Sequence, residues 1–402
     1  MIRREHNNIF EKIAYIALCF ALIFAFSGNG SAINFADNPV FFLIAILTGL
    51  AGIVWNKKFC VTDPIIFWFL VWFMVYTVIT GALSPYTDPG TFKTMVVAAG
   101  LVLVIVSTNF SWSDVKKIET SVIIGSSIFS ILVLFFGHYY LSTGTGKYTY
   151  IQSFGDNIIF EPNFLAFFIT VGFEITVIRL MQTLQGDRKF VRKLGIFLIA
   201  SVQMLAMFRT GSRLSLVATV LFVVMYILFS KNKKLKKGLL AIVLVAIIFL
   251  FIAIVFHIIP ESMVKRLFQV SYLDGSNLKR IADWLYGIKA MLSSVFGYGP
   301  VVTSNVIKDV YGFYGDAHNT FISIGIFYGI AGFILFILMW LHMMIQLASH
   351  KDYEYFSMLI SVFFQANILP LQCTVMFWLF MLLVFMKIYL LKKENIVYCF
   401  KQ

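Results

Sequence analysis

Charged residues are scarce in this chain. Asp, Glu, Lys and Arg make up only 13% of its 402 residues, whereas 60% are hydrophobic. A soluble domain is about one quarter charged and about half apolar. The composition therefore excludes an ordinary soluble enzyme. Repeated apolar runs of about 17–25 residues, separated by short charged segments, instead predict a polytopic helical membrane protein.

Cysteine is also scarce, and its four residues Cys19, Cys60, Cys373 and Cys399 stand singly. This spacing predicts neither a zinc site nor a disulfide. The acids outside the apolar runs do not cluster either, as Asp156, Asp274, Asp283 and Asp316 show. We therefore expect no metal and no other cofactor.

Positive charge exceeds negative charge, giving a formal net charge of +13. In a soluble protein this excess could indicate nucleic-acid binding. In a membrane protein it is explained by the positive-inside rule, so we expect no nucleic-acid partner. The segment Lys231–Lys237 is the clearest cytoplasmic marker, and charge counting then places both termini in the cytoplasm.

The predicted fold is an all-α polytopic membrane protein with about twelve transmembrane helices. The first span could instead be read as a signal peptide, although an uncleaved span fits the repeating pattern better. The expected spans are 13–27, 40–55, 64–80, 94–110, 118–136, 162–181, 194–208, 214–230, 238–259, 320–347, 357–371 and 373–391.

One long polar segment interrupts the apolar pattern. It divides the chain into residues 1–259 with spans one to nine, a long extracytoplasmic loop 260–318, and residues 319–402 with the last three spans and a cytoplasmic tail. Loops of this length are usually functional. Apolar residues at helical spacing predict an amphipathic helix within the loop, over about 277–293.

A second cluster of cations lies between spans seven and eight, at Arg209-Thr-Gly-Ser-Arg213. Each guanidinium offers a planar fork of donors that suits a phosphate or pyrophosphate. The alternative is that these arginines contact lipid headgroups at the membrane surface. Both arginines are expected on the extracytoplasmic side, where the positive-inside rule does not explain them.

Further candidates lie near the long loop. Lys279 and Arg280 begin the predicted loop helix, and either cation could bind an anion or simply be solvated. His318 precedes span ten and could act as a general base, although a lone histidine is more often structural.

Two more polar elements could bind substrate. Glu161-Pro-Asn163 opens span six, where Glu161 could contact a sugar or only favour the helix start. Asn319 follows His318 directly, and we treat the two residues together as one motif.

Together these motifs resemble the bacterial O-antigen polymerase/ligase superfamily of Wzy-type polymerases and WaaL-type ligases. His318-Asn319, followed after nine residues by Gly329-Ile-Ala-Gly332, is similar to the histidine motif of the ligases. Thr210-Gly-Ser-Arg213 is similar to a turn between middle spans. The stretch from Arg280 to Gly297-Tyr-Gly299 is similar to the family's loop arginine and Gly-x-Gly turn.

The resemblance implies a metal-independent, inverting glycosyltransferase of polysaccharide or lipopolysaccharide biosynthesis in the bacterial inner membrane. By carry-over, His318 would activate the acceptor hydroxyl, while Arg280 and Arg213 would hold the leaving group. Arg209, Glu161, Asn163, Asn319 and Lys279 would bind substrate. The expected partners are an undecaprenyl-pyrophosphate-linked glycan, an acceptor glycan, membrane lipids and a chain-length regulator.

Three functions remain open. A polymerase would join lipid-linked repeat units, and the compact loops and the Glu161-Pro-Asn163 element favour it. An O-antigen ligase would transfer the polymer to lipid A-core. A lipid-linked oligosaccharide flippase or other transporter would place polar residues near the bilayer midplane. Here the polar residues lie mainly at the outer surface, which favours an enzyme.

Overall fold

The protein is represented by a computed structural model. It describes residues 9–24, 39–56, 63–108, 110–140, 147–153, 156–159, 162–185, 190–229 and 275–399, together with residues 236, 238, 240, 248 and 255. Expected span 238–259 therefore lies almost wholly outside the described residues, as does Glu161.

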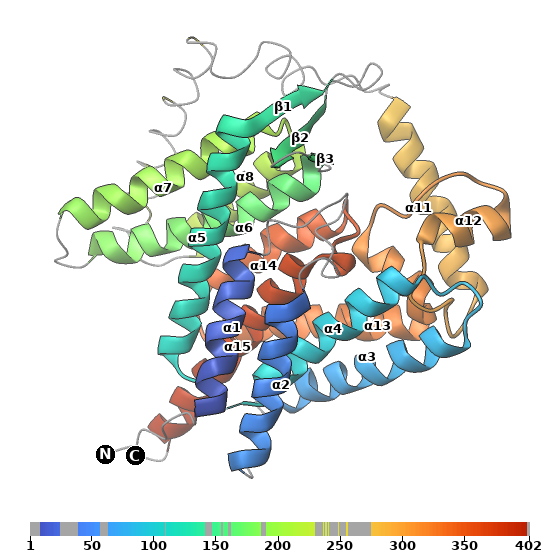
Figure 1. Ribbon diagram of the computed structural model, residues 1–402, viewed down its shortest axis with the longest axis horizontal. Coiled ribbons are helices and arrows are strands. Elements are labelled where there is room, and N and C mark those ends of the chain that lie inside the picture. Colours follow the sequence, from blue (N-terminus) through green and yellow to red (C-terminus); the bar gives the residue numbers. More distant parts are fainter. Residues whose placement is uncertain are drawn as a thin grey trace.

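Helices dominate the described part of the chain (Figure 1). Their bounds are α1 Ile9–Phe24, α2 Pro39–Asn56, α3 Pro64–Leu83, α4 Pro89–Val106, α5 Trp112–Phe136, α6 Pro162–Gln185, α7 Phe190–Arg209, α8 Arg213–Phe229, α11 Gly275–Ser293, α12 Thr303–Tyr311, α13 Thr320–Ser349, α14 Tyr353–Ala366 and α15 Val375–Cys399, with a short 3₁₀ turn η1 Leu371–Cys373. The expected loop helix is confirmed as α11, whereas α12 lies in a stretch expected to be loop.

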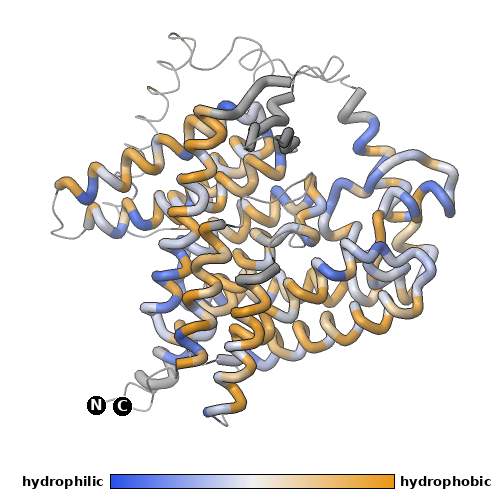
Figure 2. Tube along the Cα trace, in the orientation of Figure 1, coloured by the Kyte–Doolittle hydropathy of each residue, from blue (hydrophilic) through white to orange (hydrophobic). Residues whose placement is uncertain are grey.

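Six of these helices are long and apolar enough to cross a membrane: α3, α4, α5, α6, α7 and α13. Two shorter apolar stretches, 42–56 in α2 and α8, add to them. The arrangement is consistent with a polytopic membrane protein, and the total of about twelve spans stays a prediction. In Figure 2 the helices are mainly hydrophobic, and hydrophilic positions gather at helix ends and on α11 and α12.

Local capping explains where several helices begin. Asp63 and Asp88 each precede a proline, and their carboxylates accept backbone N–H groups in the first turns of α3 and α4. Proline suits the first turn because its missing N–H would have no partner there. These Asp-Pro pairs fix both helix starts through contacts between residues close in sequence.

A small antiparallel sheet follows α5, which corrects the strictly all-α expectation. Its strands are β1 Gly137–Tyr140, β2 Lys147–Ser153 and β3 Asp156–Ile159, in the order β1-β2-β3. Tyr, Thr and Ile are frequent in these segments, and such residues favour strands. The segments are short and contain polar residues, so hydropathy alone did not distinguish them from a loop.

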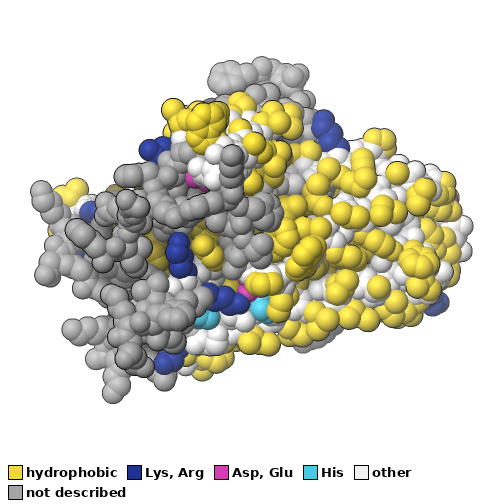
Figure 3. All heavy atoms as spheres, turned by 90° about the horizontal axis from the view of Figure 1, so that it is seen from below, with side chains coloured by type: hydrophobic (Ala, Val, Ile, Leu, Met, Phe, Trp, Pro, Cys, Tyr) yellow, Lys and Arg dark blue, Asp and Glu magenta, His cyan; other side chains and the backbone are white. Residues whose placement is uncertain are grey.

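The surface carries many large apolar side chains that no protein contact covers. On α3, for example, Trp68 is 65% exposed and Leu83 is 78% exposed. Figure 3 shows a broad hydrophobic surface on its right-hand side, with basic side chains gathered toward the left. Exposed apolar area of this extent is expected where lipid replaces water as the solvent.

The start of α3 and the last turns of α13 and α15 meet at one end of the bundle. Asp63 accepts hydrogen bonds from Lys392 and from His342, the latter at 3.1 Å between Nε2 and Oδ2. We call this the Asp63 end. The opposite end holds the close of α3, the start of α4 and the start of α13, and we call it the His318 end. Segments expected on one side of the membrane thus meet at one end.

Candidate functional site

Arg209 and Arg213 flank the tight turn between α7 and α8. Gly211 has φ of +67°, a conformation that glycine adopts without steric cost. Arg209 donates a hydrogen bond to the carbonyl of Leu134, near the end of α5. It therefore satisfies a carbonyl that has no partner within its own helix, which is a structural role beside the predicted binding role.

The turn is also tied to the start of α6. The hydroxyl of Ser212 donates to Oδ1 of Asn163 at 2.9 Å. Asn163 was a predicted substrate-binding residue, and this bond uses its side-chain oxygen to hold the turn. Arg213 is the first residue of α8 and is partly exposed.

His318 and Asn319 lie at the start of α13. Asn319 is the N-cap, because its Oδ1 accepts the N–H groups of Phe321 at 2.8 Å and Ile322 at 3.1 Å. Its Nδ2 donates to the carbonyl of Asn367 at 2.8 Å. The amide of Asn319 is thus occupied by capping and by the end of α14, and its predicted contact with substrate gains no support from this geometry.

His318 itself has φ of +43°, a left-handed conformation that is uncommon outside glycine. Such conformations cost about 1–3 kcal/mol and concentrate at functional sites. The side chain is 42% exposed, so a ligand can reach the imidazole.

Helix α13 is broken at Gly329, where φ is +69° and ψ is −173°. The break frees the carbonyls of Ile326 and Phe327, which accept the N–H groups of Tyr298 at 2.8 Å and Gly299 at 2.9 Å. The Gly-x-Gly turn of the loop therefore docks by its backbone on the broken helix.

Only glycine permits this docking. A Cβ added at Gly329 would lie 2.0 Å from the carbonyl oxygen of Val295, and one added at Gly297 would lie 2.3 Å from that of Phe327. The two glycines of the sequence motifs thus meet each other. They fasten the loop to α13 at Gly329, ten residues beyond Asn319.

Further bonds fasten the same loop to α3 and α4. The Tyr76 hydroxyl donates to the carbonyl of Phe296 at 3.0 Å, and the Asp88 N–H donates to that of Pro300 at 3.0 Å. Figure 1 shows α11 and α12 together at the right-hand edge of the molecule, beside the ends of α3 and α4. The loop is consequently a fixed part of the His318 end.

Helix α11 packs against α13 through a face that its sequence did not indicate. Its fully buried positions are Asp283, Gly287, Ala290 and Met291. The expected apolar face included Ile281, Leu285 and Leu292, which are 54%, 56% and 60% exposed. The sequence predicted an amphipathic helix without saying which face packs: small side chains allow the close approach to α13, while these three larger apolar side chains face outward.

This packing places Asp283 beside His318. Oδ2 of Asp283 lies 4.0 Å from Nε2 of His318, and the Asp283 side chain is only 1% exposed. Neither carboxylate oxygen has a hydrogen-bond partner in the described part of the chain. Burial raises the pKa of Asp283, while the nearby His318, Lys279 and Arg280 lower it and Asp316 raises it.

Arg280 lies one turn before Asp283 on α11 and is partly exposed. Within the described residues it forms no hydrogen bond or ion pair, and its influence on Asp283 shows that it lies near the carboxylate. The structure therefore brings together Arg280, Lys279 and His318. Sequence reasoning missed Asp283, although its position three residues after Arg280 placed both on one side of a helix.

The Arg213 turn reaches the same end through α14. The Ser215 hydroxyl donates to Oε1 of Gln365 at 3.3 Å, and two residues later the carbonyl of Asn367 accepts the bond from Asn319. Helix α14 thus bridges the starts of α8 and α13. Within the described residues, no group of three or more His, Cys, Asp and Glu side chains is arranged to hold a metal ion.

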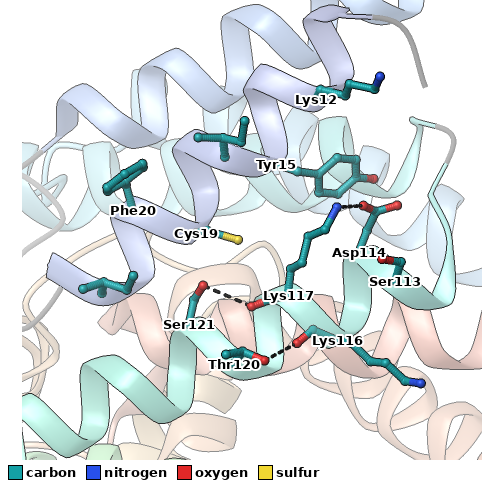
Figure 4. Close-up of a pocket in the computed structure, with 12 residues that line it drawn as sticks. Lys12, Tyr15, Cys19, Phe20, Ser113, Asp114, Lys116, Lys117, Thr120 and Ser121 are labelled. Atoms are coloured by element: carbon teal, nitrogen blue, oxygen red, sulfur yellow. Dashed lines mark hydrogen bonds and ion pairs between the residues drawn. The ribbon is translucent and has the colours of Figure 1, made fainter. Parts of the chain in front are cut away.

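A groove of about 670 Å³ lies elsewhere, between α1 and α5 (Figure 4). Its walls include Lys12 and Tyr15 of α1 and Lys116, Lys117 and Asp114 near the start of α5. The groove contains none of the predicted site residues. The candidate site is therefore defined by its polar groups at the His318 end.

Comparison with protein families agrees with these motifs. The family described as O-antigen ligase matches residues 195–337. The matched segment begins in α7 and ends in α13, so it includes Arg213, Arg280, His318 and both glycines of the docked loop. A comparison with curated proteins finds no match. The chain is therefore similar to the O-antigen ligase family over residues 195–337, which supports its resemblance to the O-antigen polymerase/ligase superfamily.

Proposed function

We propose that the protein is a polymerase of lipid-linked polysaccharide repeat units. It transfers glycan from undecaprenyl pyrophosphate to the hydroxyl of an acceptor sugar, at the outer face of the bacterial inner membrane. The observation that carries the proposal is that an accessible histidine and an arginine without a hydrogen bond or ion pair among the described residues both lie near the Asp283 carboxylate.

The reaction requires a base and a stabilised leaving group. The acceptor hydroxyl attacks the anomeric carbon and gives its proton to His318, while the bond from that carbon to the pyrophosphate oxygen breaks. The leaving pyrophosphate keeps the electron pair. Its charge is stabilised by the guanidinium groups of Arg280 and Arg213. Attack from the face opposite the pyrophosphate inverts the configuration, and the chemistry needs no metal.

The fixed loop supplies the positioning that such catalysis requires. Catalytic groups act efficiently only when they are held near the reacting geometry. Here Arg280 is carried by a helix packed against α13, and the loop after it is fastened at Gly297–Gly299. Lys279 and Arg209 add positive charge that attracts the anionic donor.

A ligase is the second candidate, because the matched family is described by that activity. Both enzymes would use the same donor and the same base, and they differ only in the acceptor. The glycan ladder of a deletion strain separates them. A core carrying one repeat unit indicates a lost polymerase, whereas a naked core with polymer left on the carrier indicates a lost ligase.

The deletion strain also tests the proposed catalytic residues, when it is complemented with variants of the protein. Cells carrying only His318→Ala, Arg280→Ala or Arg213→Ala are expected to lose the polymer while the protein still inserts, as checked by immunoblotting of membranes. Polymer of normal length and amount with His318→Ala would contradict the assignment of the base. An unchanged ladder in the deletion strain itself would favour a transporter or a different glycan.

A further inference from the structure

The most unusual polar group in the described part of the chain is the carboxylate of Asp283. It is almost fully buried, and neither oxygen has a hydrogen-bond partner among the described residues. A buried carboxylate without hydrogen bonds is costly. Such a group persists when it serves a purpose other than stability, so its surroundings indicate what it does.

The surroundings are built to hold the carboxylate in place. A Cβ added at Gly315 would lie 2.0 Å from Oδ1 of Asp283, so only glycine leaves space for this oxygen. Phe313, two residues earlier, stacks on Tyr286 of α11, with ring centroids 4.2 Å apart. The segment before His318 therefore wraps over α11 and encloses Asp283.

His318 is the group toward which this carboxylate points. Its Nε2 lies 4.0 Å from Oδ2, which is beyond a hydrogen bond but short enough for an electrostatic interaction with the buried carboxylate. Because Nε2 faces the carboxylate, Nδ1 is the nitrogen left to meet an acceptor hydroxyl.

The other charged groups near Asp283 cannot replace this contact. Lys279 and Arg280 lie on α11 itself and are exposed or partly exposed, and Asp316 accepts a hydrogen bond from Thr303. Asp316 is itself an acid, so it cannot neutralise the negative charge of Asp283. His318 is consequently the one histidine whose charge the Asp283 carboxylate can balance within the described residues.

We propose that Asp283 is a positioning residue for His318, which holds the imidazole through Nε2 and balances the charge gained when Nδ1 accepts the proton of the acceptor hydroxyl. This inference rests on the proposed function. Asp283 touches neither donor nor acceptor, so it acts through the histidine only.

Asp283→Asn tests the proposal, since it keeps the shape of the side chain and removes the charge. We expect the turnover rate of transfer to fall at least tenfold, with the KM for the lipid-linked donor unchanged. The matched control is Asp309→Asn, which removes an exposed acid from α12 of the same loop and should leave transfer unchanged.

A second readout does not depend on transfer. Diethyl pyrocarbonate modifies neutral imidazole, and mass spectrometry of the His318 peptide follows this reaction across a pH series. Without the carboxylate the imidazolium is less favoured, so the midpoint of modification should move to lower pH in Asp283→Asn. An identical midpoint in the variant and the wild type would overturn the proposal, whatever happens to activity.

Gly315→Ala provides an independent variant if Asp283→Asn does not fold. The added methyl group displaces the carboxylate while leaving its charge in the protein, so the modification midpoint should again move to lower pH. If His318→Ala retains transfer while these midpoints still shift, the pairing holds and the proposed function fails. If His318→Ala loses transfer and the midpoints stay fixed, the proposed function holds and the pairing of Asp283 with His318 fails.

Discussion

The two ends of the bundle differ in the contacts made by Asp63 at one end and by Arg280 at the other. At the Asp63 end the charges are paired: Asp63 contacts both His342 and Lys392, and Arg179 forms an ion pair with Glu119. At the His318 end, Arg280 has no hydrogen bond or ion pair among the described residues. Paired charges stabilise a structure, whereas a cation without a protein partner near an accessible histidine is suited to binding a ligand.

Two buried acids express the same contrast. Burial would raise the pKa of Asp63, but hydrogen bonds from His342 and Lys392 outweigh it and hold that pKa well below its ordinary value. For Asp283 burial dominates, and its pKa is raised despite the cations nearby. The difference arises because Asp63 receives direct hydrogen bonds and Asp283 receives none. Asp63 is therefore held by direct bonds, whereas Asp283 is the acid to which we assign a positioning role.

The largest effect should follow from removing the base. His318→Asn places a residue that tolerates the left-handed conformation, so the fold should be retained. Transfer should fall by about 10²–10⁴-fold, the usual contribution of a general base. The glycan ladder and a transfer assay in isolated membranes measure this. His342→Asn, at the Asp63 end, is the control, and an equal loss of transfer from it would erase the contrast between the ends.

A smaller loss is expected from changing the shape of one cation. Arg280→Lys keeps the charge but removes the planar fork that contacts two phosphate oxygens. Transfer should fall by about tenfold to a hundredfold, since one bidentate contact contributes on the order of 1.5–3 kcal/mol. Lys289→Ala, an exposed cation on the same helix, should behave like the wild type. Equal rates for Arg280→Lys and wild type would mean that Arg280 supplies charge alone.

The fastening of the loop gives the next prediction. Gly329→Ala puts a side chain at φ of +69° and against the Val295 carbonyl, so the loop should detach from α13. We expect a destabilisation of more than about 2 kcal/mol and faster proteolysis near Val295. Melting in detergent measures the first effect. Gly195→Ala is a matched control because nothing lies within 4 Å of its new methyl group.

The smallest effect on function should come from the Asp63 end. Asp63→Asn preserves the cap of α3 but removes the charge, and should cost about 2 kcal/mol of stability at neutral pH with transfer unchanged. A lowered folded-state pKa stabilises the protein above the ordinary pKa of Asp, and this stability is lost as pH falls through the folded value. Melting temperatures across a pH series should therefore converge for variant and wild type in acid.

Features that depend on neighbours along the chain are encoded locally, although the fourth span was expected to start at residue 94 and α4 begins at Pro89. Asp63-Pro64 and Asp88-Pro89 define helix starts by themselves, and Asn319 caps α13 through N–H groups two and three residues later. The candidate residues His318 and Arg280 were also found this way, from motifs. Capping and turn formation act within one turn of helix, so local sequence suffices.

Features that depend on packing were missed. The apolar periodicity of α11 predicted an amphipathic helix but not its packing, and the helix buries Asp283 and Gly287 while Ile281 and Leu285 are exposed. In a soluble protein a stripe of apolar side chains along a helix would be buried, but in a membrane protein it can face lipid. The break in α13 at Gly329 was also not predicted, because it depends on a loop more than thirty residues earlier in the chain.

The sequence by itself determined a membrane protein of apolar helices and the motifs that gather at one end of the bundle. Only the tertiary structure decided which face of α11 meets α13, and therefore that a buried carboxylate lies beside His318. The physical reason is that hydropathy indicates which segments prefer lipid to water. Contact between two helices depends instead on how closely small side chains allow them to pack.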